Sequence, residues 1–509
     1  MSDVFLPLLV AIPIVLSVVP LIAGLRYERA GWPIAFVGSI TVTAIAGYVA
    51  VTIASSGRLI HALGNYPQPY GIELVGDELS ALVALLIAIV SLAVLLYART
   101  AGPRGNAFYS GYLLLTGGLF GVALTGDMFN LFVFLEITSL VTYALVASDR
   151  TSGKAAYAAF KYVFLGTVGA SMYLLGVGYL YVATGTLNMR DLQEAIASVG
   201  YGDPIVQAAF GFILVGFAIK VALFPLHTWQ PDAYTYAPDS VSAYISALVS
   251  TASAYALIRI TYGVFTQSFL EANDLIVTAI LVVASVSIVV GSLLALMQTE
   301  VKRMFAYSSV AQFGMIVAAI GLANETALFG AILHLLGHGL IKAGLFMAAG
   351  VLATAYGART VTDYAGLSRR SPYAVGGMTL AGIALIGLPP SIGFLGKWFM
   401  ALGAVEAGAW GVAAVIFAST MLTLAYVFRL VEMLYFRSPS AARTDESAAV
   451  EVPDASTDGV AAPDGGSIDR VTVAQVAIVV SIGITVIALG FSWELFADYL
   501  DPVLGRFFA

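Results

Sequence analysis

The chain has 509 residues, of which 60% are hydrophobic and only 10% are charged, and its formal net charge is −7. This composition excludes a soluble globular domain. The sequence contains no cysteine, which excludes disulfides, thiolate metal sites and Cys-ligated iron–sulfur clusters. It also has no basic patch and no phosphate-binding glycine-rich motif. We therefore expect no nucleic-acid partner, no cofactor and no metal.

Apolar runs long enough to cross a bilayer recur from one end of the chain to the other. They predict an all-α polytopic membrane protein with about 14 transmembrane helices. The first run has no basic region before it and no small-residue cleavage pattern, so we interpret it as a span and not as a signal peptide. The expected spans are 3–24, 32–54, 79–98, 108–126, 128–147, 157–184, 205–227, 238–265, 273–298, 302–322, 327–355, 375–402, 407–436 and 472–493.

Basic residues in the loops predict the orientation. Most of them follow odd-numbered spans, so the positive-inside rule places these loops in the cytoplasm and both termini outside a prokaryotic plasma membrane. The opposite side carries only Arg58, Arg190 and Arg506. The basic residues counted in the cytoplasmic loops are Arg26, Arg29, Arg99, Arg104, Arg150, Lys154, Lys161, Lys302, Arg303, Arg359, Arg369, Arg370, Arg437, Arg443 and Arg470.

Two stretches outside the spans have their own character. Residues 64–78 are expected to form an extracytoplasmic hairpin packed on the bundle. Residues 437–470 are rich in Ala, Ser, Asp and Pro and lack apolar periodicity. That composition is typical of an acidic, disordered linker, here on the cytoplasmic side.

Two spans are interrupted by proline, and each carries one lysine. Lys220 precedes Pro225 in GFAIKVALFPLHTWQPDAY, and Lys397 follows Pro389 and Pro390 in GLPPSIGFLGKWFM. Proline breaks a helix because it lacks an N–H, and broken helices commonly form the ion sites of transporters. The interrupted spans lie five apart, which predicts two inverted five-helix repeats. The expected organisation is 1–107 (spans 1–3 and the hairpin), 108–265 and 273–436 (the repeats), 437–470 (the linker) and 471–509 (span 14).

The basic residues inside spans are Lys220, Arg259, Lys342, Lys397 and Arg429. A desolvated lysine can lose its proton, whereas arginine practically cannot. Lysines in the interior and arginines in the loops therefore favour a role in proton handling. Arg259 and Arg429 lie towards span ends, and we interpret them as structural.

Glu136 is the only charged residue in its apolar span. We expect it to pair with a lysine and to bias the charge state of that lysine. The alternative is a purely structural carboxylate. For Lys220 the alternative is a side chain that snorkels from a helix end, and for Lys397 it is an interfacial lysine beside Trp398.

His334, His338 and Lys342 recur every four residues and so share one helix face. Imidazole exchanges protons near neutral pH, so we interpret this face as a row lining a hydrated path. The alternatives are a metal site, for which no carboxylate or thiol accompanies the pair, and satisfied core histidines. His227 and Asp232, at the mouth beside Pro225, are either a proton entrance or polar anchors.

Five motifs together carry a resemblance: GDMFNLFVFLE, FAIKVALFPLHTWQPDAY, KRMFAYSSVAQFGMI, HLLGHGLIKAGLF and GLPPSIGFLGKW. Over residues 64–402 the chain resembles the proton-conducting antiporter-like subunits of respiratory complex I, membrane-bound hydrogenases and Mrp-type Na+/H+ antiporters. TGDMFNLFVFLEI and YGIELVGDELSALVALL resemble the D component of the Mrp group most closely. The resemblance implies fourteen helices, two inverted five-helix repeats and broken seventh and twelfth helices.

The resemblance also implies roles for single residues. Glu136, Lys220, His334, His338 and Lys397 match the family's proton-transfer positions. Thr251 stands where the family usually has a bridging lysine. Threonine can hydrogen-bond water but cannot hold a charge, so either a hydroxyl or water bridges this gap or the relay is broken there.

Three functions follow as hypotheses. The first is a proton-translocating subunit of a multisubunit Na+/H+ antiporter, with other membrane subunits, protons and Na+ as partners. The second is a proton-pumping membrane subunit of a redox-driven oxidoreductase or hydrogenase, whose electrons would travel in partner subunits. The third is a largely structural membrane scaffold.

Overall fold

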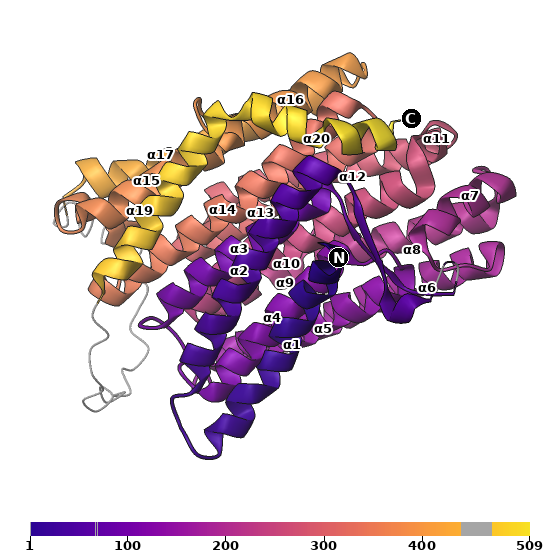
Figure 1. The fold of residues 1–509 in the computed structure, drawn as a ribbon. Helices are drawn as coiled ribbons and strands as arrows, with labels where there is room; N and C mark the ends of the chain where they lie inside the picture. Colours follow the sequence, from indigo (N-terminus) through magenta and orange to yellow (C-terminus); the bar gives the residue numbers. More distant parts are fainter. Residues whose placement is uncertain (1, 67, 69, 439–470, 509) are drawn as a thin grey trace.

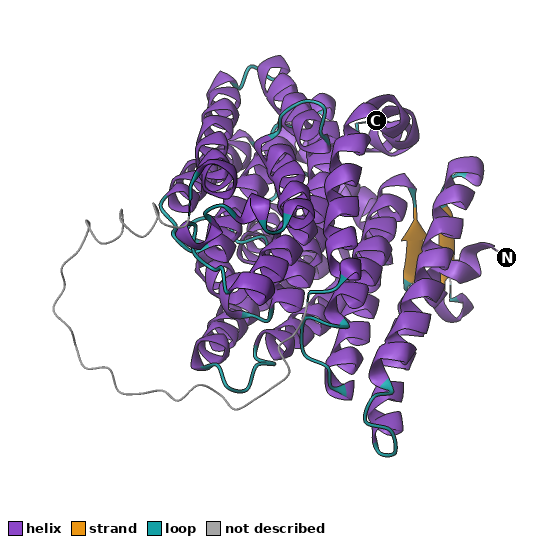
Figure 2. Cartoon of the chain, turned by 90° about the vertical axis from the view of Figure 1, so that its left-hand side faces the viewer, coloured by secondary structure: helices purple, strands orange, loops and turns teal. Residues whose placement is uncertain are grey.

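The computed structural model describes residues 2–66, 68, 70–438 and 471–508. Within these ranges the chain forms 19 α-helices and one two-stranded sheet, so it is almost entirely helical (Figure 2). The polytopic helical fold expected from the sequence is confirmed. The expected linker, 437–470, lies almost wholly outside the described residues.

Fourteen apolar segments match the expected spans. In the described part of the chain, 12 helices are long and apolar enough to cross a membrane, and α8 and α15 are shorter apolar helices at the two spans predicted to be broken. Most of them run in roughly the same direction in Figure 1. The helices are α1 (Phe5–Gly24), α2 (Gly31–Ser56), α3 (Glu78–Ala98), α4 (Asn106–Leu124), α5 (Met128–Val146), α6 (Gly153–Thr184), α8 (Pro204–Lys220), α10 (Asp239–Ile260), α12 (Asp274–Leu296), α13 (Val301–Gly321), α14 (Glu325–Tyr356), α15 (Pro372–Ile386), α17 (Trp410–Phe436) and α19 (Val473–Ala488).

Both broken spans are interrupted where the prolines stand. After α8 the chain continues through a 3-10 turn, Leu226–Thr228, into α9 (Trp229–Tyr236). After α15 it continues into α16 (Ile392–Glu406). α8 ends at Lys220, before Pro225, so this lysine is the last residue of its helix and does not lie within a longer one.

The centre of the bundle is formed by α10, α13 and α14 (Figure 1). The most apolar 18-residue stretch of each helix is fully buried in α10 and α14 and 94% buried in α13. Glycine, alanine and serine are frequent in these helices and allow their backbones to approach closely. At Gly339 of α14, for example, a Cβ atom would lie 3.0 Å from the carbonyl oxygen of Ala247 of α10. Polar residues of these helices therefore face protein on all sides.

Several elements were not expected from the sequence. The hairpin predicted for 64–78 begins earlier than expected: β2 (Glu73–Gly76) lies within that range and pairs antiparallel with β1 (Leu59–Ala62), which precedes it, with Leu59 opposite Gly76. α7 (Met189–Val199) and α11 (Thr266–Glu271) are short helices between spans. α20 (Trp493–Phe507) follows α19 as a separate amphipathic helix that packs on α3 and α14, so 471–509 is more than a single span.

Candidate functional site

Lys220 and Glu136 lie together, at the junction of α8 and α5. Lys220 Nζ is 3.5 Å from Glu136 Oε1 and donates a hydrogen bond of 2.7 Å to Ser139 Oγ. Glu136 and Ser139 are three residues apart on α5, so both project from one helix face. The lysine side chain is only 8% exposed and that of Glu136 is 25% exposed. The structure therefore forms the ion pair that the isolated carboxylate in this span suggested.

Each broken span places an ammonium group at the C-terminal end of its first half. Lys220 is the last residue of α8. Lys397, from α16, donates hydrogen bonds of 2.9 Å to the carbonyl oxygens of both Leu385 and Ile386 in the last turn of α15. Carbonyl groups at a helix C-terminus have no partner within the helix and carry partial negative charge, which stabilises a cation. No carboxylate of the described residues forms an ion pair with Lys397.

The predicted row on α14 is completely buried, and α13 supplies most of its partners. His334 Nε2 lies 2.8 Å from Gln312 Oε1. Lys342 Nζ donates to the carbonyl oxygen of Phe305 at 2.7 Å and also to Ser308 Oγ. Both ring nitrogens of His338 lack a hydrogen-bond partner among the described residues. Buried polar groups of this kind are ordinarily satisfied by water, so this face suits a hydrated path.

A cluster of uncharged polar side chains leads from Lys220 towards α14. Gln230 Nε2 donates to the hydroxyls of Tyr234 (3.1 Å) and Ser250 (3.3 Å). Ser250 Oγ in turn donates to the carbonyl oxygen of Lys220 at 3.3 Å. The Tyr234 ring packs edge-on against Phe346 of α14, with centroids 5.9 Å apart. Hydroxyl and amide groups therefore occupy the region between the first lysine and the central row.

Thr251 lies in the same region, next to Ser250 on α10. It is 1% exposed, and its hydroxyl has no hydrogen-bond partner within the described chain. The position thus offers a hydroxyl and no charge, as the sequence indicated.

Sequence reasoning did not single out these uncharged partners. Ser308 and Gln312 are four residues apart in an apolar stretch of α13, a weak signal for a polar face. Serine, threonine and glutamine occur in helices for many reasons, so only the packing shows which of them face the lysines and histidines. The residues missed are Ser139, Gln230, Tyr234, Ser250, Ser308 and Gln312.

Asp232 joins three helices at the mouth beside Pro225. Its carboxylate accepts hydrogen bonds from Lys161 of α6 (2.8 Å) and from Arg303 of α13 (3.1 Å). A carboxylate engaged by two cations has the geometry of a structural anchor. His227 lies nearby, with its ring against Phe224 and Tyr307, and its Nδ1 has no partner in the described part of the chain.

Glycines bring α14 and α16 close enough to align His334 with Lys397. At Gly396 a Cβ atom would lie 2.5 Å from Cβ of His334. Gly387 follows α15 with a positive φ of 85°, and a Cβ atom there would lie 2.9 Å from Cδ of Lys397. The position of Lys397, at the end of the row, therefore depends on the absence of side chains at Gly387 and Gly396.

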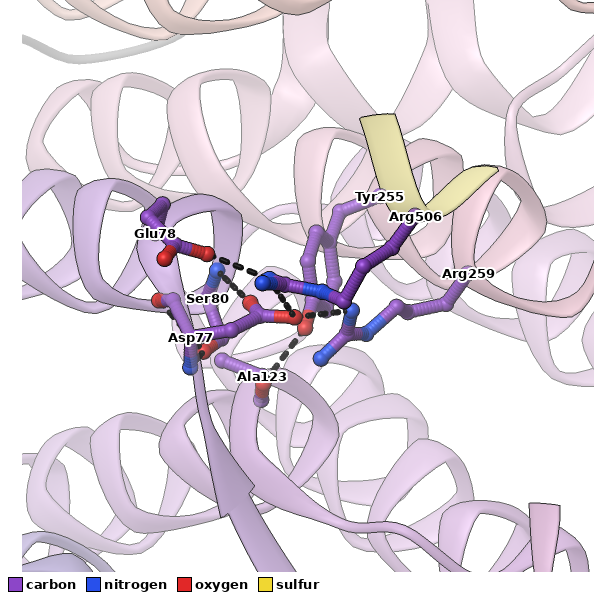
Figure 3. A network of polar contacts seen from close by, with 7 residues as sticks. All are labelled: Asp77, Glu78, Ser80, Ala123, Tyr255, Arg259 and Arg506. Atoms are coloured by element: carbon purple, nitrogen blue, oxygen red, sulfur yellow. Dashed lines mark hydrogen bonds and ion pairs between the residues drawn. The ribbon is translucent and has the colours of Figure 1, made fainter. Parts of the chain in front are cut away.

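Arg259 belongs to a separate network at the other end of α10, shown in Figure 3. Asp77 caps α3 and accepts from Arg259 at 2.5 Å, while Arg506 of α20 contacts both Asp77 and Glu78. Burial raises the pKa of Asp77, but the adjacent Arg259 guanidinium, the Ser80 backbone N–H and Arg506 together outweigh it and hold this pKa below its ordinary value. The network fixes the C-terminal helix to α3 and α10, in keeping with the structural role expected for Arg259.

Comparison with known proteins adds to this geometry. Residues 125–423 match the family described as "NADH:quinone oxidoreductase/Mrp antiporter, TM". The chain is 41% identical over 441 residues to "NADH-quinone oxidoreductase subunit N" of Desulforudis audaxviator, covering 84% of this chain and 87% of that protein. It is 32% identical over 389 residues to the D component of the "Na(+)/H(+) antiporter" of Bacillus subtilis, covering 76% of this chain and 78% of that protein.

A solved structure is similar along nearly the whole length. It is a chain of the membrane-bound sulfane sulfur reductase, described as an archaeal respiratory membrane complex. The TM-score is 0.86 and the sequence identity is 30%, with 99% of this chain and 97% of that chain covered. The two named relatives and this structure carry the names of three different systems: an NADH-quinone oxidoreductase, a Na(+)/H(+) antiporter and a sulfane sulfur reductase.

Proposed function

Because the chain belongs to the NADH:quinone oxidoreductase/Mrp antiporter family of membrane subunits, as its motifs predicted, we propose that it moves protons along its buried polar row. It acts within a multisubunit membrane complex. The row runs from Glu136 and Lys220 through His338 and His334 to Lys397. The observation that carries the proposal is the pair of lysines held at the ends of α8 and α15, inside otherwise apolar spans.

The Glu136–Lys220 pair is the element whose charge can be switched. At 3.5 Å, and with an effective dielectric constant of about 20, two unit charges attract by about 5 kcal/mol. When Glu136 moves away or is neutralised, the ammonium of Lys220 loses most of this attraction and releases a proton more readily. The Ser250, Gln230 and Tyr234 cluster, with water, offers the route onward to α14.

At the far end, Lys397 receives the proton. Its ammonium form is stabilised by two carbonyl groups and no carboxylate of the described residues, so neither proton state is locked by an ion pair. A terminal carrier requires this balance, because it must both accept and release the proton.

We propose sodium antiport as the coupled process. The support is the pair of motifs that resemble the D component of the Mrp group, together with the relative that is named as a Na(+)/H(+) antiporter component. Redox-driven proton pumping is the second candidate, favoured by the 41% identity to the relative named NADH-quinone oxidoreductase subunit N.

Inverted membrane vesicles that carry the assembled complex test both parts. The pH change inside the vesicles is followed with a fluorescent dye after addition of Na+ or of NADH. A change driven by Na+ without an electron donor supports antiport, and a change that requires NADH supports the redox-driven candidate.

Two variants of Lys220 test the row itself. Lys220→Ala removes the charge, whereas Lys220→Arg keeps it but does not release a proton at ordinary pH. We expect both variants to lose the pH change by about tenfold or more. Arg26→Ala, at an exposed position, is the control and should transport normally. Normal transport by Lys220→Ala refutes the proposal. Normal transport by Lys220→Arg shows that the positive charge of Lys220 has only a structural role, which would favour the hypothesis of a structural membrane scaffold.

A further inference from the structure

A second buried lysine–carboxylate pair, besides Lys220–Glu136, lies at the opposite end of α10 from the network of Figure 3. Asp239 begins α10, and Lys302 lies in the first turn of α13. Lys302 Nζ donates 2.9 Å to Asp239 Oδ1 and 2.8 Å to the carbonyl oxygen of Ala237. From the sequence, Lys302 was expected among the basic residues of a loop; in the structure it lies in the first turn of α13 and its side chain is only 10% exposed.

Lys302 therefore belongs with the buried lysines, although its position in the sequence indicated a loop residue. Four of the six lysines of the chain are buried: Lys220, Lys302, Lys342 and Lys397. Glu136 pairs with the first of these and Asp239 with the second. The row proposed above uses the first pair only.

Two cavities meet at the Asp239–Lys302 pair. One, of about 210 Å³, is lined by Lys302, Glu300, Lys154 and Tyr364. The other, of about 590 Å³, is lined by Asp239 and reaches the exposed Asp149. Thr235, Tyr236 and Arg359 line both cavities. A single water needs only about 10–15 Å³ of such space, so together these cavities form a vestibule that holds many waters.

Buried hydroxyl groups lie near the same ion pair. The hydroxyls of Tyr97 and Tyr364 are buried and have no hydrogen-bond partner in the described ranges, and Tyr364 lines the smaller cavity with Lys302. Tyr97 Oη and the Asp239 carboxyl group also approach the same glycine of α14, Gly350. The charged groups around Asp239 are thus Lys302 and Arg359, with Lys154 and Glu300 at the cavity wall. Buried hydroxyl groups ordinarily have a hydrogen-bond partner, so hydroxyls without a protein partner indicate that this pocket is hydrated.

From Lys302, the first turns of α13 lead inward to Lys342 on α14. Phe305 is three residues beyond Lys302, and its carbonyl group accepts from Lys342 Nζ at 2.7 Å. Ser308, three residues further, also accepts from Lys342. Lys302 and Ser308 are separated by six residues, or about 9 Å along the helix axis. Transfer of a proton from Lys302 to Lys342 therefore requires water to bridge this interval.

We propose that Asp239 and Lys302 form a proton-loading site, at the inner end of the vestibule, that loads Lys342 directly, while Glu136 and Lys220 load the other end of the α14 row, and that turnover requires both sites. The inference rests on the proposed function. A proton from vestibule water binds to the Asp239 carboxylate and releases Lys302. The Lys302 ammonium passes its proton through water to the neutral amine of Lys342. The proton on Asp239 then moves to Lys302, which restores the original pair with one proton transferred.

The absence of cysteine makes the vestibule directly testable. A single cysteine at Ala353, which lines the smaller cavity, is compared with one at Ala343 of the same helix, which is 0% exposed. Inverted vesicles expose the face that the positive-inside rule assigns to the cytoplasm. A membrane-impermeant maleimide should shift the gel mobility of the Ala353→Cys chain only. Equal labelling of both variants, or labelling of neither, overturns the vestibule.

Transport by three variants tests the loading step. We expect Asp239→Asn to lower proton transport by about tenfold or more, while Asp274→Asn, at the exposed start of α12 and outside the vestibule, transports normally. Lys302→Arg keeps the ion pair and the fold but does not release a proton, so it should lose transport while the complex assembles. Normal transport by Lys302→Arg overturns the loading site. If Lys220→Ala abolishes transport in that case, the proposed function stands and only this inference fails.

Discussion

Replacing Gly387 by alanine, compared with a matched control, distinguishes an effect on the position of Lys397 from an effect on the stability of the helix bundle. Gly387 has a φ of 85°, which costs an alanine about 1–2 kcal/mol. The new Cβ atom would also lie 2.9 Å from Lys397 Cδ and 3.3 Å from the carbonyl oxygen of Gly393. The lysine tail must then shift away from Leu385 and Ile386, whose carbonyl groups it contacts at 2.9 Å.

The expected loss of stabilisation of the Lys397 ammonium follows from its hydrogen bonds to Leu385 and Ile386. A hydrogen bond to a charged group contributes about 1.5–3 kcal/mol, so weakening two of them destabilises the ammonium form by more than about 1.4 kcal/mol. If proton transfer to Lys397 limits transport, this corresponds to a loss of about tenfold or more.

Gly408→Ala is the matched control. Gly408 also has a positive φ, 69°, but nothing lies within 4 Å of its added Cβ atom. Both variants should lower the melting temperature of the purified complex by similar amounts, because the backbone cost is shared. Only Gly387→Ala should impair the dye-monitored pH change in inverted vesicles. Equal transport by the two variants would refute the reasoning, because the contact with Lys397 would then have no consequence.

Three further predictions concern the centre of the bundle and the C-terminal helix. Thr251→Val removes the hydroxyl at nearly constant volume and should reduce transport by about tenfold or more, whereas Thr251→Ser should not; equal rates would show that the path bypasses this residue. Arg506→Gln should free α20 from Asp77 and expose it to limited proteolysis, while the distant Arg26→Ala should not. Because Arg259 lowers the pKa of Asp77, the Asp77 contribution to stability is complete above about pH 4, the ordinary range of aspartate, and is lost only as pH falls through the lower folded-state pKa. Release of α20 at neutral pH in the unmodified protein would contradict this assignment.

The sequence by itself determined the membrane fold and the first half of the site. Twenty or so apolar residues in succession can only cross a bilayer as a helix, because backbone groups find no other partners in lipid. Proline fixed the two interruptions for an equally local reason. Charged residues in such spans are rare and costly, so Glu136, Lys220, Lys342 and Lys397 can be recognised as candidates from their positions in the sequence alone.

Other features have no local signal. Lys302 stands at a predicted span boundary, where a basic residue is ordinary, and its partner Asp239 is 63 positions away. Their meeting depends on α10 and α13 beginning at the same level of the bundle. The uncharged groups around the lysines, such as Ser250 and Gln312, also acquire meaning only from the helices that face them.

The amphipathic helix α20 shows the same division. The apolar stripe of α20 indicates only that this helix packs against other helices. The contacts of Arg506 with Asp77 and Glu78, more than four hundred residues away in the sequence, form only in the folded chain. Hydropathy and helix breaking are properties of neighbouring residues, so the sequence determined the spans and their breaks. Ion pairs, cavities and hydrated contacts form between helices, so only the tertiary structure decided which buried groups share one path.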